Sequence, residues 1–319
     1  MKISPEHRKK QYRDIFEMVF DDPRIKLNAL AKMLELDWRT IKQRILEALE
    51  LQIIVGPHLR KRSYENLKEY MYFLNCKNPV EEFLRLREDM NVTYHAKATG
   101  FCNLWIISRR KIDFDEQIIA EGFCSDYHVS FAPDRTWDTA IQIIQEKVEN
   151  FDPQNYTPQG IIKTQWGRTI EWDEKDEMLY RYFKYNMRKP VGPAMEEYQI
   201  SGGKLYSFFD KLPEACTIAT GYFPDTLSGY DPFLYMFETD YEDFLIDLFS
   251  ELPTTSFFFK ASDRLFVYIH VPKQLVRSPD LKASIKRLHI PLLINDLSKK
   301  GIIREQAESN IDYSWGKDL

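Results

Sequence analysis

The feature that most constrains this chain is an internal repeat. Residues 259–267 (FKASDRLFV) match residues 96–104 (AKATGFCNL) at an offset of 163 positions, and both copies carry Lys-Ala-(Thr/Ser) just before a turn. The order of expected helices and strands around the two segments also recurs. In a chain of 319 residues this repeat predicts two copies of one structural unit. The 44% hydrophobic content is enough to give each copy a packed core.

Residues 1–62 show the periodicity of three helices followed by two strands. Ser4 and Pro5 form a helix-start signal, and Asp37 is a good N-cap for the third helix. The expected elements are helices over residues 5–21, 27–34 and 38–50 and strands over 51–55 and 58–62, with a turn at Gly56-Pro57. This order is typical of a winged helix-turn-helix domain, whose third helix enters the DNA major groove.

Charge favours a DNA-binding role for this first module. Residues 1–62 hold 14 Lys and Arg against 9 Asp and Glu, a net charge of +5, whereas the whole chain has −5. Basic side chains supply most of the affinity of DNA-binding proteins. The candidate contacts from the third helix and the wing are Trp38, Arg39, Thr40, Lys42, Gln43, Arg44, Arg60, Lys61 and Arg62. The alternatives are that this basic face is only solvated surface, and that Trp38 packs on the second helix.

Residues 63–151 predict a strand, a helix, two strands and a later helix, which is the ferredoxin-like plan. Residues 152–171, which contain Pro153 and Pro158, form the expected linker to the second copy. The second copy comprises a degenerate winged helix over residues 172–226 and another ferredoxin-like domain over 227–319. The expected fold class is therefore α+β, a winged helix-turn-helix plus a ferredoxin-like (ACT/RAM-like) domain, repeated twice in tandem.

The second winged helix differs chemically from the first. Residues 172–226 contain 7 Lys and Arg against 9 Asp and Glu, so the segment has a net charge of −2. Its third helix is expected to expose Tyr206, Phe208 and Phe209 where the first copy has Lys42 and Arg44. Aromatic side chains in place of cations favour packing against another domain. The alternative is a second DNA-reading head.

Two segments resemble a known family. Residues 37–45 (DWRTIKQRI) and the turn at residues 98–107 (ATGFCNLWII) are similar to the leucine-responsive regulator/AsnC family of prokaryotic transcription factors. The resemblance implies a homodimer that binds double-stranded operator DNA and senses a small-molecule effector near Thr99, Gly100 and Asn103. Cys102 and Asn103 depart from the family, which usually has an aromatic residue and an Asp there. The alternative role for Gly100 is to supply a positive φ angle.

An enzyme is an alternative to this regulator. Sirohaem decarboxylases look like the same family in paired or fused copies, and they use His and Arg residues around a tetrapyrrole pocket. The chain lacks a His-rich turn after the first sheet helix, as well as the phosphate-loop, H-E-x-x-H and G-x-S-x-G motifs. His95 and His128, on neighbouring expected strands, are candidates to face one pocket. The expectation is a regulator that is not an enzyme and has no catalytic residue, metal site or cofactor; the alternatives are a sirohaem-decarboxylase-like enzyme and a protein-interaction module.

Hydropathy and cysteine usage favour a cytoplasmic protein with no membrane partner. The mean hydropathy is −0.46, and no apolar run approaches the roughly 20 residues that span a bilayer. The N-terminal residues show no apolar segment of a secretory signal. The four cysteines form no C-x-x-C pair, so we expect free buried thiols.

Overall fold

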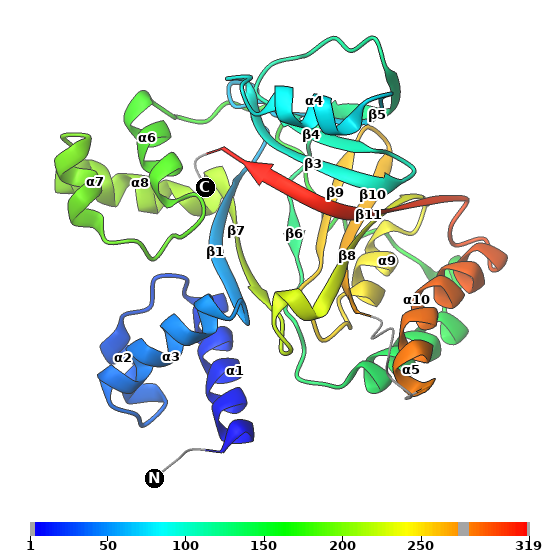
Figure 1. Ribbon diagram of the computed structural model, residues 1–319, viewed down its shortest axis with the longest axis horizontal. Helices are drawn as coiled ribbons and strands as arrows, with labels where there is room; N and C mark the ends of the chain where they lie inside the picture. Colours follow the sequence, from blue (N-terminus) through cyan, green and yellow to red (C-terminus); the bar gives the residue numbers. More distant parts are fainter. Residues whose placement is uncertain (1–3, 274–280, 318–319) are drawn as a thin grey trace. The chain divides into compact units, whose positions relative to one another are not determined.

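The computed structural model describes residues 4–273 and 281–317, and the chain divides into two compact units. The helical unit comprises Met1–Lys61 and Glu171–Gly229, and the sheet unit comprises Arg62–Ile170 and Tyr230–Lys317 (Figure 1). Each unit therefore takes one segment from each half of the chain. The mixed α+β class is confirmed, whereas the five-part division along the sequence stays a prediction.

The helical unit contains two similar sets of three helices and a strand. The first set, called the first head, is α1 (Pro5–Asp21), α2 (Leu27–Met33), α3 (Trp38–Glu50) and β1 (Ile54–Lys61). The second head is α6 (Glu174–Phe183), α7 (Val191–Glu197), α8 (Gly202–Ala215) and β7 (Cys216–Tyr222). The helices lie where the sequence predicts them, because their caps and apolar periodicity are local signals. As expected, Asp37 caps α3 by accepting the backbone N–H groups of Arg39 and Thr40, each at 3.0 Å.

The predicted wing is wrong. Residues 54–61 form one strand that passes through Gly56-Pro57, and this strand pairs antiparallel with β7 of the second head, from Ile54 opposite Tyr222 to Lys61 opposite Cys216. The Gly-Pro pair produces a register shift in this ladder instead of a hairpin turn. Each head thus supplies one strand of a shared two-stranded sheet.

Half-buried arginines join the two heads within the helical unit. Arg188 of the second head donates to the carbonyl oxygens of Pro23 at 3.0 Å and Ile25 at 2.8 Å. Arg24 of the first head donates to the carbonyl oxygen of Met187 and lies 4.4 Å above the ring of Phe209. Burial lowers the pKa of both arginines. Phe208 is buried in the core of its own head and Tyr206 is exposed, so the predicted aromatic surface of α8 is only partly present.

The sheet unit is built on a curled antiparallel sheet of nine strands in the order β5-β2-β4-β3-β11-β8-β10-β9-β6. From the first half of the chain come β2 (Tyr70–Asn75), α4 (Pro79–Leu86), β3 (Val92–Gly100), β4 (Leu104–Ser108), β5 (Gln117–Phe123), β6 (His128–Val129), α5 (Trp137–Asn150) and η1 (Pro153–Asn155). From the second half come η2 (Leu227–Gly229, in the helical unit), β8 (Tyr230–Glu238), α9 (Glu242–Phe249), β9 (Phe257–Ala261), β10 (Arg264–Pro272), α10 (Leu281–Lys299) and β11 (Glu305–Gly316).

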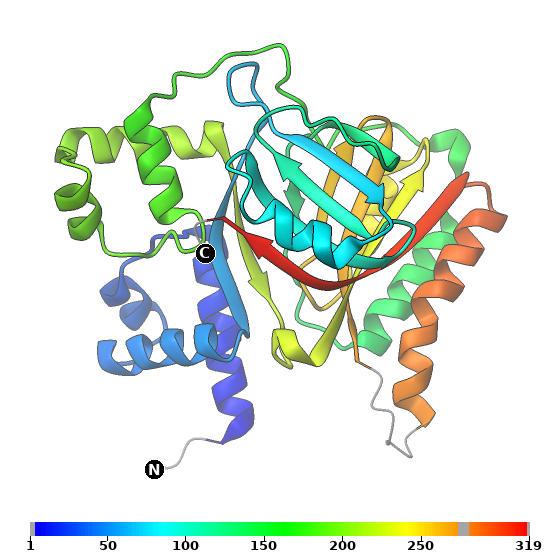
Figure 2. The same ribbon diagram turned by 45° about the horizontal axis from the view of Figure 1, so that its top comes forward.

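Strand β11 joins the two halves of this sheet. It pairs with β3 on one side and with β8 on the other, so it lies between the two repeats (Figure 1). Helix α4 covers the outer face beside β3, while α9 and α10 contact the outer face at β10 (Figure 2). The opposite edges of the sheet approach each other where Cys124, just after β5, bridges to Ala261 of β9. The inner face is therefore concave.

A close approach fixes the β3–β11 junction. Gly100 has a φ angle of +148°, and a Cβ atom there would lie 2.2 Å from the carbonyl oxygen of Glu308. We expect Gly100→Ala to lower the free energy of unfolding of the sheet unit by about 3 kcal/mol or more, because both backbone strain and overlap oppose the side chain. Urea unfolding followed by tryptophan fluorescence measures this.

Gly167→Ala is the control, since no atom lies within 4 Å of a Cβ at that position. Equal urea midpoints for the two variants would show that the junction does not require glycine.

Candidate functional site

The predicted DNA-contacting residues do not form one surface. Arg44 is buried, with 6% of its side chain exposed, and it donates to Gln11 and Glu47, each at 2.7 Å. Lys61 has 7% of its side chain exposed and pairs with Glu177 of the second head. Local sequence patterns do not reveal the carboxylates that pack against these two cations.

The remaining predicted contacts are dispersed. Gln43 donates to Glu47 at 2.8 Å, and Thr40 donates to the capping Asp37 at 2.5 Å. Arg60 sits in the ladder opposite Thr217, and Arg62 belongs to the sheet unit, where it lies 3.6 Å from Asp126. Four predicted residues stay exposed on α3, namely Trp38, Arg39, Lys42 and Gln43. Trp38 does not bury itself on the second helix.

The three predicted effector residues have structural partners. Thr99 donates to Asp312 of β11 at 2.9 Å, and Gly100 makes the close approach to the same strand. The side chain of Asn103 accepts from the backbone N–H of Cys76 at 3.0 Å and donates to its carbonyl oxygen at 2.7 Å. These groups hold turns and strands together.

The two candidate histidines do not share a pocket. His95, on β3, packs on the outer face against Phe83 at 4.3 Å and Trp315 at 5.2 Å, while His128, on β6, contacts Phe258 at 5.7 Å. Strands β11, β8, β10 and β9 separate them in the sheet. Sequence proximity suggested neighbouring strands, but the insertion of the second repeat moves β6 to the far edge.

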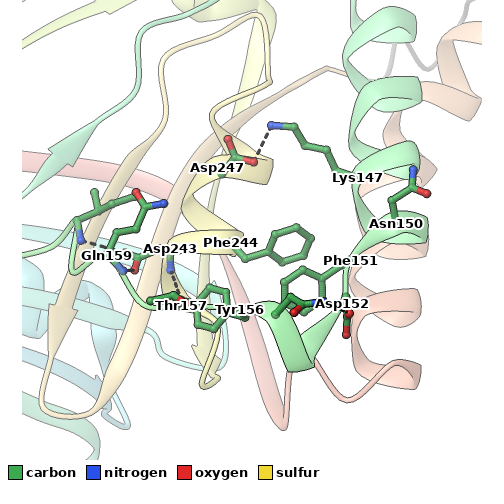
Figure 3. A pocket seen from close by; sticks show the side chains of 12 residues that line it. Lys147, Asn150, Phe151, Asp152, Tyr156, Thr157, Gln159, Asp243, Phe244 and Asp247 are labelled. Atoms are coloured by element: carbon green, nitrogen blue, oxygen red, sulfur yellow. Dashed lines mark hydrogen bonds and ion pairs between the residues drawn. The ribbon is translucent and has the colours of Figure 1, made fainter.

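A pocket of about 720 Å³ lies between the end of α5, the following linker and α9 (Figure 3). Its aromatic wall contains Phe151 and Phe244, which stack with 3.9 Å between ring centroids. The carboxylate of Asp243 accepts three backbone N–H groups, from Gln159 at 2.6 Å, Gly160 at 3.0 Å and Ile161 at 2.9 Å. Asp243 therefore anchors the linker against α9.

The charge of this pocket disfavours an anionic ligand. Its lining includes Asp152, Asp243 and Asp247, and Lys147 is its one cation among the described residues. Burial alone would lower the pKa of Lys147, but the hydrogen bonds that it donates to Asp247 and Glu251 raise this pKa above its usual value. Lys147 lies 2.6 Å from each of these carboxylates. Its charge is thus already neutralised.

The concave face of the sheet carries a second candidate site. We call its aromatic and aliphatic core the concave cluster, which comprises buried Met71, Phe73, Ala96, Ala98, Cys102, Trp105, Ile107, Cys124, Leu234, Phe259, Ala261, Phe266 and Ile311. Half-buried Tyr94, Tyr127 and Tyr268 pack against it. The rings of Phe73 and Phe266 stack at 4.2 Å across the curl. Both repeats therefore contribute to one face.

Trp105 gives this face a hydrogen-bond donor. Its ring lies 5.1 Å from Tyr94 and 6.2 Å from Tyr268, and the residue is only 6% exposed. The buried indole Nε1–H has no acceptor among the described residues. An unsatisfied buried N–H costs about 1–3 kcal/mol. A ligand oxygen placed on this face would remove that cost.

His270 adds an ionisable group beside these rings. It lies two positions after Tyr268 on β10, hence on the same face, with 5.0 Å between the ring centroids. Burial lowers the pKa of His270 to about 3, so the imidazole is neutral at pH 7. A neutral imidazole on an aromatic face can accept a proton or a hydrogen bond. No group of three or more His, Cys, Asp or Glu side chains in the described ranges could hold a metal ion.

The internal repeat carries a sequence signal for this site. The offset of 163 positions, continued by one residue beyond the matched segments, pairs Trp105 with Tyr268. It also pairs Tyr94 with Phe257 and Ile107 with His270. The repeat thus places one copy of each position around a single face, and only the second copy carries the imidazole.

Comparisons with known proteins return few matches. No family model and no curated protein matches the chain. A crystal structure of the siroheme decarboxylase NirDL is similar at 12% identity and a TM-score of 0.49, covering 96% of this chain and 92% of that chain. Its complex with an iron-uroporphyrin III analogue is similar at 13% identity and a TM-score of 0.48, with the same coverage. At this level the likeness assigns no activity to the chain.

The assignment to the leucine-responsive regulator family is corrected by these findings. The comparisons return structures of an enzyme and none of a regulator. Within the helical unit, Arg44 and Lys61 are held by carboxylates and the wing hairpin is missing. The regulator function, the double-stranded DNA partner, the regulator-type homodimer with its effector and the expectation of no enzymatic activity are therefore all withdrawn. No helix of the described residues has the length and apolarity needed to cross a membrane.

The buried imidazole of His95 should make the stability of the sheet unit depend on pH. Burial lowers the pKa of His95 to about 4, so the folded state favours the neutral ring. The stability that this provides is complete above the unfolded pKa of about 6.5 and is lost as the pH falls toward 4. Between pH 7 and pH 5 the loss amounts to about 2 kcal/mol.

We expect His95→Gln to reduce the pH dependence of the unfolding free energy by this amount, while its amide still donates to Phe83. Urea unfolding at the two pH values measures it. His7→Gln, at an exposed position, is the control. A pH dependence that is the same in His95→Gln and the unmodified chain would contradict the prediction.

Proposed function

We propose that the sheet unit binds a planar conjugated small molecule on its concave face, and that the chain acts on a tetrapyrrole in the manner of a sirohaem decarboxylase. The observation that carries the proposal is the buried indole N–H of Trp105, which lacks an acceptor among the described residues and lies on a face of half-buried aromatic rings. Such a face suits a flat apolar ring system. The indole suits a ligand oxygen, such as a side-chain carboxylate.

The chemistry of this face favours loss of a carboxylate. A carboxylate that approaches Trp105 moves from water to an aromatic surface. The loss of water destabilises the localised charge of the carboxylate more than the dispersed charge of the transition state. When the bond to carbon dioxide breaks, its electron pair stays on the side-chain carbon, which then takes up a proton. The hydroxyl groups of Tyr94 and Tyr268 are the proton-carrying groups on this face. The proton that either hydroxyl gives to the carbon is replaced by one from solvent, since neutral His270 accepts protons and does not supply them.

The concave cluster also narrows the class of ligand. Its members are apolar side chains. Burying several carboxylates there without cations would cost several kcal/mol each. We therefore propose that one carboxylate meets Trp105 while the others stay in water, and that a porphyrin with fewer carboxylates binds at least as tightly as uroporphyrin.

The finer fold is part of this proposal. We infer a tandem duplication of a winged-helix head and a ferredoxin-like domain, with boundaries at residues 1–62, 63–151, 152–171, 172–226 and 227–319. The matched order of α1, α2, α3 and β1 with α6, α7, α8 and β7 supports it. So does the pairing of Trp105 with Tyr268 on one face. A cytoplasmic location is proposed as well, supported by the free buried thiols of Cys76, Cys102, Cys124 and Cys216.

Trp105→Phe tests the site, because it keeps an aromatic ring and removes the N–H. The full chain is titrated with iron-uroporphyrin III and with a dicarboxylate porphyrin, and the Soret band and tryptophan quenching are followed. We expect the variant to bind about 10- to 100-fold more weakly, since a hydrogen bond to a charged acceptor contributes about 1.5–3 kcal/mol.

Trp137→Phe is the matched control. The indole N–H of Trp137 is also buried without an acceptor among the described residues, but Trp137 begins α5 and lies outside the concave cluster. Mass spectrometry of sirohaem incubated with the chain detects the loss of carbon dioxide. Unchanged affinity in Trp105→Phe, or no binding of either porphyrin, would exclude the site; binding without mass loss would exclude the decarboxylase activity alone.

A further inference from the structure

Helix α3 of the first head has an unusual exposed face. Trp38, Lys42 and Leu46 are spaced by four residues, so they lie along one side of the helix, beside the row of buried Ile41 and Ile45. Trp38 is 49% exposed and Leu46 is 56% exposed. Single exposed apolar side chains are ordinary, but a row of them on one helix is not.

More exposed apolar side chains lie near α3 in the sequence. Among the exposed large apolar side chains of the described residues, four fall within residues 33–51, namely Met33, Trp38, Leu46 and Leu51. Met33 ends α2, directly before the turn into α3. All four belong to the first head, and Trp38 and Leu46 share one side of α3.

The charge on this face is positive. Arg39 lies beside Trp38, with its guanidinium 5.7 Å from the indole ring, and Lys42 is exposed in the middle of the row. No carboxylate among the described residues pairs with either side chain. Glu47, the nearest acid on the helix, is turned toward Tyr12, Gln43 and Arg44. The cations are therefore available to an external acidic group.

We propose that this face of α3 docks an acidic amphipathic helix of another protein. The apolar row fits the anchor side chains that such a helix carries at intervals of three or four residues, and Arg39 and Lys42 complement acidic residues flanking those anchors. The proposal rests on the helical unit alone and is independent of the tetrapyrrole site.

The mixed chemistry argues against nucleic acid as the occupant. A duplex offers phosphates and base edges, and it leaves Leu46 and Met33 facing a polar surface, with little apolar burial to offset their exposure. The predicted cations that would strengthen phosphate binding, Arg44 and Lys61, are held elsewhere.

The second head provides a built-in comparison. On α8, Lys204 lies 2.8 Å from Asp173 and 2.7 Å from Asp176, and Lys211 lies 3.1 Å from Asp176. Tyr206 is 72% exposed but stands as the one large exposed apolar side chain that the described part of α8 carries. A surface without free cations and without an apolar row should not bind the same partner.

The test uses the full chain, immobilised, and a pool of synthetic helical peptides about 18 residues long, or five turns. The peptides carry Leu, Ile, Met or Phe at the anchor positions and Glu or Asp at the flanking positions. A second pool has the same composition in scrambled order. We expect enrichment of the patterned pool, and a loss of affinity of about tenfold or more in Leu46→Glu.

Charge reversal adds a readout that misfolding does not mimic. Lys42→Glu should weaken binding of the acidic peptides and should restore it when the facing Glu of the peptide is replaced by Lys. Tyr206→Glu, on the second head, should bind like the unmodified chain. Equal urea midpoints for all variants confirm that the head stays folded.

Three results would overturn the proposal. They are equal binding of the scrambled pool, binding that is insensitive to Leu46→Glu, and displacement of the peptides by duplex DNA at a lower concentration than by unlabelled peptide. Failure of the porphyrin titration leaves this test unaffected, because the two sites lie in different units.

Discussion

The sheet unit depends on the placement of β11, the strand that ends the described chain. It pairs with β3 of the first repeat and β8 of the second, and without it the two halves of the nine-stranded sheet would have no backbone connection in the middle. The backbone N–H of Phe101 donates to Glu308 at 2.9 Å, and Gly100 allows the close approach. The requirement for glycine follows from this strand and not from a ligand.

The concave cluster exists because the joined sheet curls. The bridge between Cys124 and Ala261 brings the edges together, and the rings of Phe73 and Phe266 then stack across the interior. Aromatic rings from both repeats line that interior. Trp105 is the exception, because its ring packs well while its N–H remains unsatisfied. The proposed site depends on this unsatisfied donor together with the aromatic rings around it.

Local sequence signals predicted the helices well and the long-range pairings poorly. Asp37 predicts the start of α3, and the apolar spacing within α5 predicts the extent of α5, because caps and periodicity involve neighbouring residues. The partner of β1 is β7, more than 150 positions away, and no turn residue specifies it. The burial of Arg44 and the concave role of Trp105 were missed for the same reason, since both depend on residues brought together only by the fold.

The positions of the basic side chains explain why the first head lacks a DNA-binding surface although its sequence follows a helix-turn-helix pattern. The net charge of +5 is distributed over residues 1–62. A charged side chain contributes to phosphate binding only where it is exposed and unpaired. Glu47 and Glu177 neutralise two cations of the predicted interface. Arg39 and Lys42 keep their charge, yet they flank Trp38 and Leu46, which gain more free energy from apolar contact than from facing a duplex. The surface chemistry of α3 thus favours a protein partner over a duplex.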